Sequence, residues 1–340
     1  MTIQRRLSAI ERGIVLPIPY GWYVVAYATD LPASGVLPLR YFAKELVLWR
    51  GEDGRPRMLG AYCRHLGAHL GYGGRVEGNA IVCPFHAWAY DDEGKVIDIP
   101  YSRAIPPQVK RPCMGTWPVV ERNQLIWAWY HPDGVAPLWE VTAVAEAEDA
   151  SWTPYDRYEW HINVHIQDMA ENGADTAHFR YTHGTASFPD QQTEFDGPIL
   201  RSLISAKMDT PRGSVDGAIR NVSMGPGQAW TRFTGISETL LIAGVTPVDI
   251  DHVHVRFNFS QPRAQAEGPG ARVAAAIVKD VVKQLEQDKL IWENKIYEPR
   301  PILCQGDGEI DRWRRWYAQF YAGPTPDSGN AALEPAVVSR

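Results

Sequence analysis

Short apolar runs, cut by glycine, proline and aspartate, fill the first third of the chain from Tyr20 to about Tyr130. Runs such as GWYVVAYA, ELVLWRG and AIVCPFHAWAYDDEGKVI are rich in the aromatic and β-branched residues that favour strands. The tetrapeptides DDEG and HPDG supply turns between such runs. This pattern predicts a small all-β domain.

The pattern changes after the stretch HPDGVAPL. Alternation in WHINVHIQ predicts a strand, and MAENGADTAHFRYTH indicates a helix or an irregular turn. Longer strands are predicted at GAIRNVSM, AWTRFTGI, ETLLIAGVTPV and HVHVRFNFS, followed by a helix from about Ala271 to Tyr297. We therefore expect the second domain to be α+β, an antiparallel sheet with helices packed against it.

These changes divide the chain into four segments. We predict an N-terminal arm at 1–16, an all-β domain at 17–132, an α+β domain at 133–325 and a mobile tail at 326–340. The length of 340 residues also favours two domains over one.

Composition narrows the classes of function. Hydrophobic residues make up 45% of the chain and charged residues 22%, which is typical of a globular protein. The net charge of −6 argues against a nucleic-acid partner, whose binders carry a basic face. No run of about 18 apolar residues predicts a membrane span, and the N-terminus does not have the pattern of a signal peptide. Four cysteines are too few for a disulfide scaffold and favour the cytoplasm.

Two short motifs each place one cysteine beside one histidine. Cys63 and His65 form C-x-H, and Cys83 and His86 form C-x2-H. Structural zinc sites, the alternative, usually group Cys with Cys and His with His. One Cys and one His from each loop suit a two-iron, two-sulfide cluster with one iron on two thiolates and the other on two imidazoles. His69 fits neither pair, and we expect it at the surface or behind the ligands.

A second metal site is indicated by His178 and His183. Two histidines five residues apart lie about 140° apart on an ideal helix, so they share a metal only if the helix ends or is distorted. A two-histidine, one-carboxylate iron site needs a third ligand. Asp288 continues the apolar stripe of the predicted helix, whereas Asp280, Gln284 and Gln287 share its polar side. A buried carboxylate needs a cation, here either a metal or a salt-bridge partner.

With these motifs the chain resembles the Rieske non-haem iron oxygenases over nearly its whole length. The cluster pattern of that family falls on Cys63, His65, Cys83 and His86, and its pattern N-x-x-D-x-x-H-x4-H falls on Asn172, Asp175, His178 and His183. AYCRHLGAHL and CPFHAW are similar to 3-ketosteroid 9α-hydroxylases, while ENGADTAH, QDKLIWENK and RRWYAQFY are equally similar to cholesterol 7-desaturases. The QDKLIWENK match also supports Asp288 as the third ligand.

The resemblance implies a fold and a set of cofactors. The fold is an all-β Rieske [2Fe-2S] domain followed by a helix-grip (START-like) catalytic domain. The cofactors are the cluster and a mononuclear Fe(II), with O2 as co-substrate. Electrons come from a ferredoxin or its reductase, and NAD(P)H binds the reductase, since no Gly-rich dinucleotide fingerprint is visible in this chain.

The resemblance also implies an assembly and a catalytic role for Asp175. In this family that carboxylate bridges a cluster histidine of one subunit to an iron histidine of the next, in a ring-shaped homotrimer. Asn172 is expected beside it as a second catalytic residue. The favoured function is the terminal oxygenase of a multicomponent monooxygenase that hydroxylates a steroid-like hydrophobic substrate. Sterol desaturation and a smaller aromatic substrate stay open as alternatives.

Overall fold

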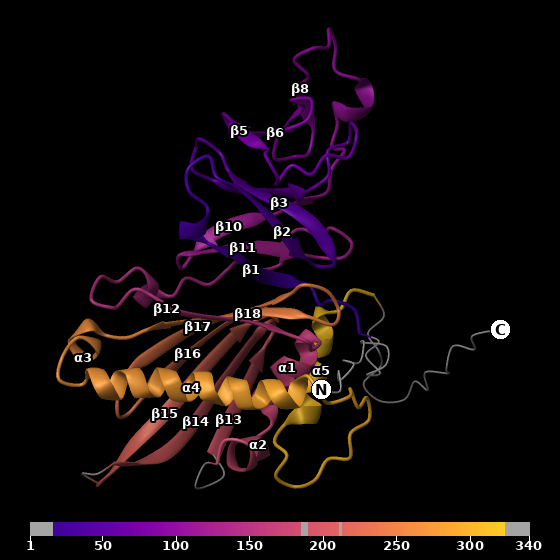
Figure 1. Ribbon diagram of the computed structural model, residues 1–340. Coiled ribbons are helices and arrows are strands. Elements are labelled where there is room, and N and C mark those ends of the chain that lie inside the picture. Colours follow the sequence, from indigo (N-terminus) through magenta and orange to yellow (C-terminus); the bar gives the residue numbers. More distant parts are fainter. Residues whose placement is uncertain (1–15, 185–189, 211–212, 324–340) are drawn as a thin grey trace, which may run out of the picture.

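The computed structural model of the protein describes residues 16–184, 190–210 and 213–323 (Figure 1). The predicted tail at 326–340 lies outside these residues, as does the predicted arm at 1–16 except for its last residue. In the described helices, none combines the length and the apolar character needed to cross a lipid bilayer.

The first part of the chain forms three small antiparallel sheets with the strand orders β1-β11-β10, β2-β3-β4-β9 and β5-β6-β7-β8. It contains short 3-10 turns and, among the described residues, no α-helix, which confirms the all-β prediction. The elements are β1 (Gly21–Tyr27), η1 (Ala28–Asp30), β2 (Val36–Tyr41), β3 (Lys44–Arg50), β4 (Pro56–Gly60), β5 (Arg75–Glu77), β6 (Ala80–Val82), β7 (Ala89–Tyr90), β8 (Val96–Asp98), η2 (Pro107–Val109), β9 (Thr116–Trp117), β10 (Val119–Arg122) and β11 (Leu125–Tyr130).

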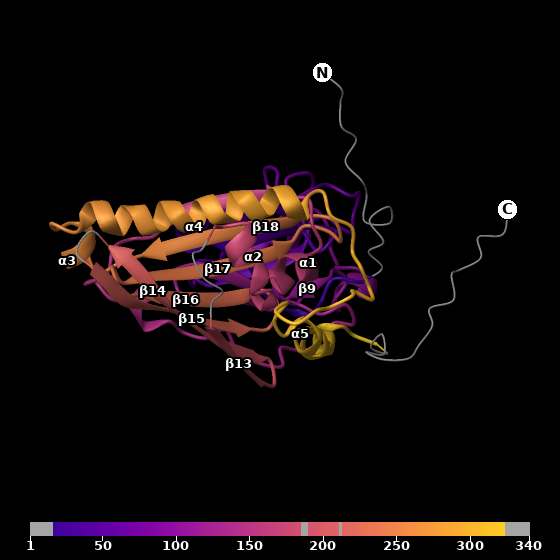
Figure 2. The same ribbon diagram turned by 90° about the horizontal axis from the view of Figure 1, so that it is seen from below.

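The second part is a seven-stranded antiparallel sheet with the order β12-β18-β17-β16-β15-β14-β13 and helices packed on it, as the α+β prediction requires. Figures 1 and 2 show α4 running along the sheet, with α1, α2 and α5 gathered at one end. The elements are η3 (Ala145–Ala147), β12 (Asp156–Ile162), α1 (Ile166–Ala170), η4 (Glu171–Ala174), α2 (Ala177–Tyr181), β13 (Asp190–Asp196), β14 (Ile199–Thr210), β15 (Gly213–Met224), β16 (Gln228–Thr234), β17 (Thr239–Pro247), β18 (Val253–Ser260), α3 (Arg263–Ala266), α4 (Ala271–Trp292), α5 (Ile310–Tyr317) and η5 (Ala318–Phe320).

The strand predicted across WHINVHIQ is wrong in its second half. β12 ends at Ile162, and His165 caps the N-terminus of α1, where its Nδ1 accepts the backbone N–H of Gln167 at 3.1 Å. A cap of this kind satisfies a helix N–H that would otherwise lack a partner, so the chain turns here instead of continuing as a strand.

The large sheet is covered on both faces, which explains why apolar and polar residues do not simply alternate along its central strands. On one face Leu240 and Ile242 pack against Trp22 and Val24 of β1. On the other face residues such as Leu241 pack against α4. The two parts of the chain therefore share their cores.

The two sheets come unusually close where β1 meets β17. A Cβ atom at Gly244 would lie 2.6 Å from the side chain of Val24, so only glycine fits there without a shift. Glycine thus lets the first part of the chain rest directly on the large sheet.

Candidate metal centres and pocket

The two Cys-His loops have the same backbone hydrogen bonds. In the first loop, between β4 and β5, the N–H of Gly67 donates to the carbonyl of Cys63 at 3.0 Å. In the second, between β6 and β7, Ala87 donates to Cys83 at 3.1 Å. Each cysteine N–H in turn donates to the residue five positions later, at 2.9 Å in both loops. Two short segments of different sequence thus form matching turns.

Each turn requires a left-handed residue four positions after its cysteine. Gly67 has φ of 75°, which costs glycine nothing, and Ala87 has φ of 56°, which L-residues rarely adopt. The same backbone therefore holds both cysteine-histidine pairs, although the histidine follows its cysteine by two residues in one loop and by three in the other.

The four side chains of these loops converge. Cys63 and Cys83 are 4% and 2% exposed and close enough for their thiols to interact. The rings of His65 and His86 lie 4.6 Å apart, and His65 stacks on Trp88 at 4.7 Å. The Nδ1 atom of His65 is buried and has no hydrogen-bond partner within the described residues. Two thiols, two imidazoles and an unpaired buried ring nitrogen fit a cluster that is held by two Cys and two His.

Tyr90 supports the first cysteine. Its hydroxyl accepts the backbone N–H of Arg64 at 3.0 Å, which leaves its own proton to donate to Cys63 Sγ at 3.1 Å. Burial raises the pKa of the Cys63 thiol, and the Tyr90 hydrogen bond opposes that rise. His69 lies aside, as expected: its Nδ1 accepts the N–H of Gly71, and its Nε2 is 3.9 Å from a carboxylate oxygen of Glu45.

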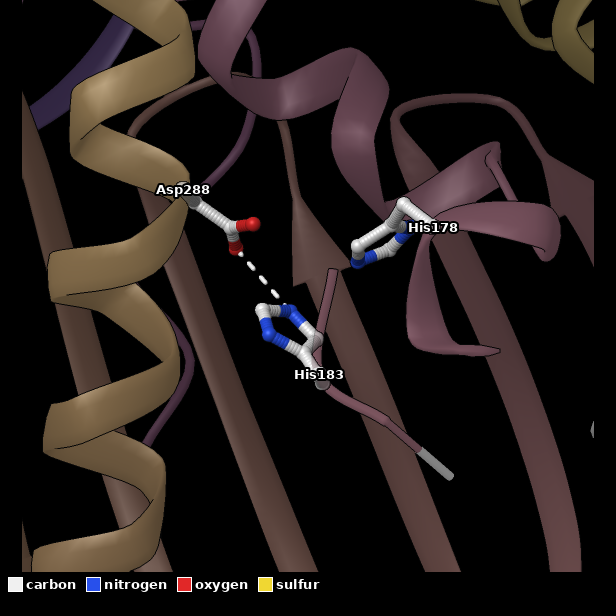
Figure 3. A group of neighbouring side chains, drawn as sticks. All are labelled: His178, His183 and Asp288. Carbon is white, nitrogen blue, oxygen red and sulfur yellow. Dashed lines mark ion pairs between the residues drawn. The ribbon is translucent and has the colours of Figure 1, made fainter. Parts of the chain in front are cut away.

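The structure brings His178, His183 and Asp288 together, with one potential ligand atom from each within 4.8 Å of the others (Figure 3). His178 lies on α2, which ends at Tyr181, so His183 lies beyond the helix. The helical spacing of 100° per residue therefore does not keep the two histidines apart. Asp288 projects from the buried side of α4 and is 7% exposed. Asp280, by contrast, is exposed and accepts a hydrogen bond from Gln284.

Both histidines are oriented through the same nitrogen, Nδ1. Nδ1 of His178 lies 2.7 Å from the backbone oxygen of Asp175, and Nδ1 of His183 lies 3.0 Å from Oε1 of Gln287. Both partners are oxygen acceptors, so each Nδ1 carries the proton and each Nε2 presents a lone pair. Gln287, which the periodicity placed on the polar side of the helix, therefore orients a candidate ligand.

Two further residues of the motif surround these side chains. Asn172 Nδ2 lies 3.1 Å from Nε2 of His178 and 3.0 Å from Oδ2 of Asp288. Asp175 Oδ1 accepts the N–H of Ala177 at 2.9 Å and that of His178 at 3.3 Å. The Asp175 side chain is 33% exposed, so its carboxylate caps α2 and still reaches the surface.

Burial sets the charges of this site. It raises the pKa of Asp288 although both histidines lower it, and it lowers the pKa of His178. A metal ligand set needs an ionised carboxylate, and the positive charge of a divalent metal would offset the cost of burying that charge. The donor set of two nitrogens and one carboxylate fits a mononuclear iron site.

A pocket of about 330 Å³ lies on the far side of Phe179 from this site, and none of the three candidate ligands lines it. Phe179, which lines it, packs against both histidine rings, with centroid distances of 4.3 Å to His178 and 5.9 Å to His183. Other parts of the wall come from α1, η4, α5 and the residues just before it, and the strands β13 to β17 with the turn between β15 and β16. A second pocket, of about 310 Å³, lies against Asp175, His178 and Asp288.

Within one chain the two candidate centres lie far apart. Figure 1 shows β6, which leads into the Cys83 loop, and α2, which carries His178, at opposite ends of the molecule. The structure thus assembles each centre but does not bring the two together.

Comparison with known proteins agrees with both parts of the fold. Residues 21–112 match the family "Rieske [2Fe-2S] domain", and residues 128–321 match "3-Ketosteroid 9alpha-hydroxylase C-terminal domain". A cholesterol 7-desaturase of Caenorhabditis elegans is 32% identical over 94% of this chain and 81% of its own length. A 3-ketosteroid-9-alpha-monooxygenase oxygenase component of Rhodococcus rhodochrous is 30% identical over 88% of this chain and 79% of its own.

Solved structures share the architecture at lower identity. Dicamba monooxygenase bound to dicamba has a TM-score of 0.69 and 17% identity, over 88% of this chain and 96% of that one. The family match that covers more than half of the chain and the curated relatives, which this chain covers over most of their length, indicate the same family. This chain therefore belongs to the Rieske oxygenases and is an oxidoreductase with a Rieske [2Fe-2S] domain and a catalytic domain of the 3-ketosteroid 9α-hydroxylase type.

Proposed function

We propose that the protein is the terminal oxygenase of a multicomponent monooxygenase that hydroxylates a neutral, steroid-like substrate. The observation that carries the proposal is the convergence of two histidines and a carboxylate beside an apolar pocket. Cys63, His65, Cys83 and His86 would hold the cluster, and His178, His183 and Asp288 the iron. When bound, these groups would supply single electrons and the activation of O2.

The residues around the iron site have distinct tasks. Gln287 and the backbone of Asp175 fix the tautomers of the two histidines, so that both lone pairs face the same space. Asn172 donates to the carboxylate of Asp288 and stabilises its charge where water is scarce. Phe179 and the apolar wall exclude water from the pocket side.

The substrate class rests on the charge of the pocket. Among its described lining residues there is no lysine, arginine or histidine, and the one carboxylate, Glu309, pairs with Arg312 at 3.0 Å. An aromatic acid would need a cation to balance its carboxylate. A neutral fused-ring compound needs only apolar walls and a few polar groups. The names of the curated relatives, which act on steroids and sterols, point the same way.

The second candidate reaction is desaturation, favoured by the similarity to cholesterol 7-desaturase. Both reactions would act on a C–H bond of a substrate held beside the same three candidate ligands, so these residues do not separate them. Mass spectrometry of the product decides: a gain of one oxygen supports hydroxylation, and a loss of two hydrogens supports desaturation.

We infer that electrons pass between subunits of a head-to-tail homotrimer. The separation of the two centres within one chain supports this (Figure 1). Large apolar side chains are exposed near both centres, Phe85 at 61% beside the cluster loop and Ile291 at 47% beside Asp288, as an interface would require. The exposed carboxylate of Asp175 would then accept a hydrogen bond from His86 of the neighbouring subunit.

The electron donor would be a ferredoxin or its reductase, and NAD(P)H would bind that reductase. The cytoplasm suits such a system, because the four cysteines are free thiols.

Reconstitution tests the function. Anaerobically purified protein should contain three irons and two acid-labile sulfides per chain, two of the irons in the cluster and one in the mononuclear site. With a ferredoxin, a reductase and NADH it should take up oxygen in the presence of 3-keto steroids or sterols. One tightly bound zinc without sulfide would refute the cluster, and uptake driven only by small aromatic acids would refute the substrate class.

Mixed oligomers test the electron path. A His86→Ala chain and an Asp288→Ala chain, each inactive alone, should regain part of the activity when coexpressed, because an intact cluster can then lie beside an intact iron site. Mixed trimers that form yet stay inactive would show that electrons pass within one subunit. Asp175→Ala should keep both metals but slow reoxidation of the reduced cluster in a single turnover.

A further inference from the structure

One continuous row of polar side chains crosses the sheet wall of the pocket. Thr193 pairs with Ser202, Ser202 with Asn221, and Asn221 with Thr231, on four neighbouring strands from β13 to β16. Directly paired residues of an antiparallel sheet lie on the same face, so the four side chains form a stripe. All four line the pocket.

The rows on either side of this stripe are mainly apolar. On one side Ile204 pairs with Ile219 and, on the edge strand, with the polar Gln191; on the other side Phe195 pairs with Leu200. Leu200 in turn pairs with Ser223, which adds one hydroxyl next to the stripe. A sheet that only had to pack against a hydrophobic molecule would not need four polar residues in one row between two mainly apolar rows.

The hydrogen bonds within the stripe run in one direction. Thr231 Oγ1 donates to Asn221 Oδ1 at 2.9 Å, and Asn221 Nδ2 donates to Ser223 Oγ at 3.2 Å. The amide oxygen thus accepts one hydrogen bond, while the amide nitrogen has a second N–H and Ser223 still has its own proton. This leaves two unused donors, the second N–H of Asn221 and the hydroxyl of Ser223.

We propose that Asn221 and Ser223 bind a carbonyl oxygen of the substrate. The inference rests on the proposed function, since it assumes a neutral fused-ring molecule in this pocket. A carbonyl oxygen has two lone pairs and no proton, which matches two converging donors. A hydroxyl group must also donate its proton, and Thr231 already occupies one of the two acceptor positions of Asn221 Oδ1. The subsite therefore favours a ketone over the corresponding alcohol and fixes how the ring system lies relative to the iron.

Calorimetric titration with three compounds of one skeleton tests this: 5α-androstan-3-one, 5α-androstan-3β-ol and 5α-androstane. The wild-type protein should bind the ketone most tightly. Ser223→Ala should weaken ketone binding about fivefold to tenfold, the usual effect of one hydrogen bond, and Asn221→Leu should reduce it to the level of the hydrocarbon. Binding of the hydrocarbon should not change in either variant.

Two further variants make the test sharper. Thr231→Val removes the hydroxyl that engages Asn221 Oδ1, so the alcohol should gain affinity relative to the ketone. Ser205→Ala makes the same change as Ser223→Ala at an exposed position of β14 that does not line the pocket, and it should change nothing.

The outcomes separate this inference from the proposed function. If the wild-type protein binds all three compounds equally, or if the variants weaken all three in parallel, the carbonyl subsite is refuted while the steroid pocket stands. If none of the three compounds binds, the proposed substrate class fails, and the subsite fails with it.

Discussion

The two candidate metal centres are built in different ways. The cluster loops are local: each completes its turn within six residues, and both use the same backbone hydrogen bonds. The iron site is assembled over a distance, since His183 and Asp288 are more than a hundred residues apart and meet only because α4 lies beside the end of α2. A local site can be recognised from a motif, whereas a distant one depends on how the whole second domain folds.

The largest effect should come from Asp288→Ala. It removes the only carboxylate among the three candidate ligands and should abolish both turnover and mononuclear iron, while the visible spectrum of the cluster is kept. Asp280→Ala, an exposed aspartate two turns earlier on the same helix, is the control and should retain activity. An active Asp288 variant with a full iron content would refute the assignment.

The next effect should come from Gln287→Leu. This change removes the acceptor that orients His183, and loss of such a partner typically costs about 10- to 100-fold in metal affinity. Iron retention during dialysis against a chelator measures it. Gln284→Leu, one turn earlier, is the matched control, because within the described part of the chain its amide bonds to Asp280 and not to His183. Equal iron loss in both variants would show that helix stability, not orientation of His183, is affected.

A smaller effect, on the stability of the protein, should have opposite signs in the two cluster loops. Gly67→Ala places a Cβ in open space but at a left-handed φ, so it should destabilise the protein by about 1–2 kcal/mol through conformation alone. Ala87→Gly should stabilise it by up to about 1 kcal/mol for the same reason. Chemical denaturation measures both. Effects of the same sign would mean that the two turns are not equivalent.

The smallest effect should be on the potential of the cluster. Tyr90→Phe removes the hydroxyl that donates to Cys63 Sγ, and loss of a hydrogen bond to a cluster sulfur lowers the reduction potential. Tyr101→Phe is the control, because its hydroxyl accepts from Trp88 and bonds to no cysteine. A redox titration with an unchanged midpoint in the Tyr90 variant would refute the role of that hydroxyl.

The sequence predicted the elements that depend on local pattern. The all-β first part followed from short apolar runs with turns, and the inward side of Asp288 followed from the apolar stripe of a long helix. Gln287 was missed, because it lies one residue from Asp288 and only the fold brings His183 to it. The row from Thr193 to Thr231 was missed for a related reason: it exists only in the register between four strands, which no single strand reveals.

The close approach of β1 to β17 at Gly244 has a consequence for protein engineering. Val24 and Trp22 pack in the same core as Leu240 and Ile242. The surface of the large sheet is therefore complementary to this Rieske domain and not to one taken from another oxygenase. A foreign domain would have to pack on a surface whose shape fits β1. Chimeras of this enzyme should therefore exchange β1, β11 and the outward face of β16 and β17 as one unit, and hybrids joined only at the linker between the domains should expose apolar surface and aggregate.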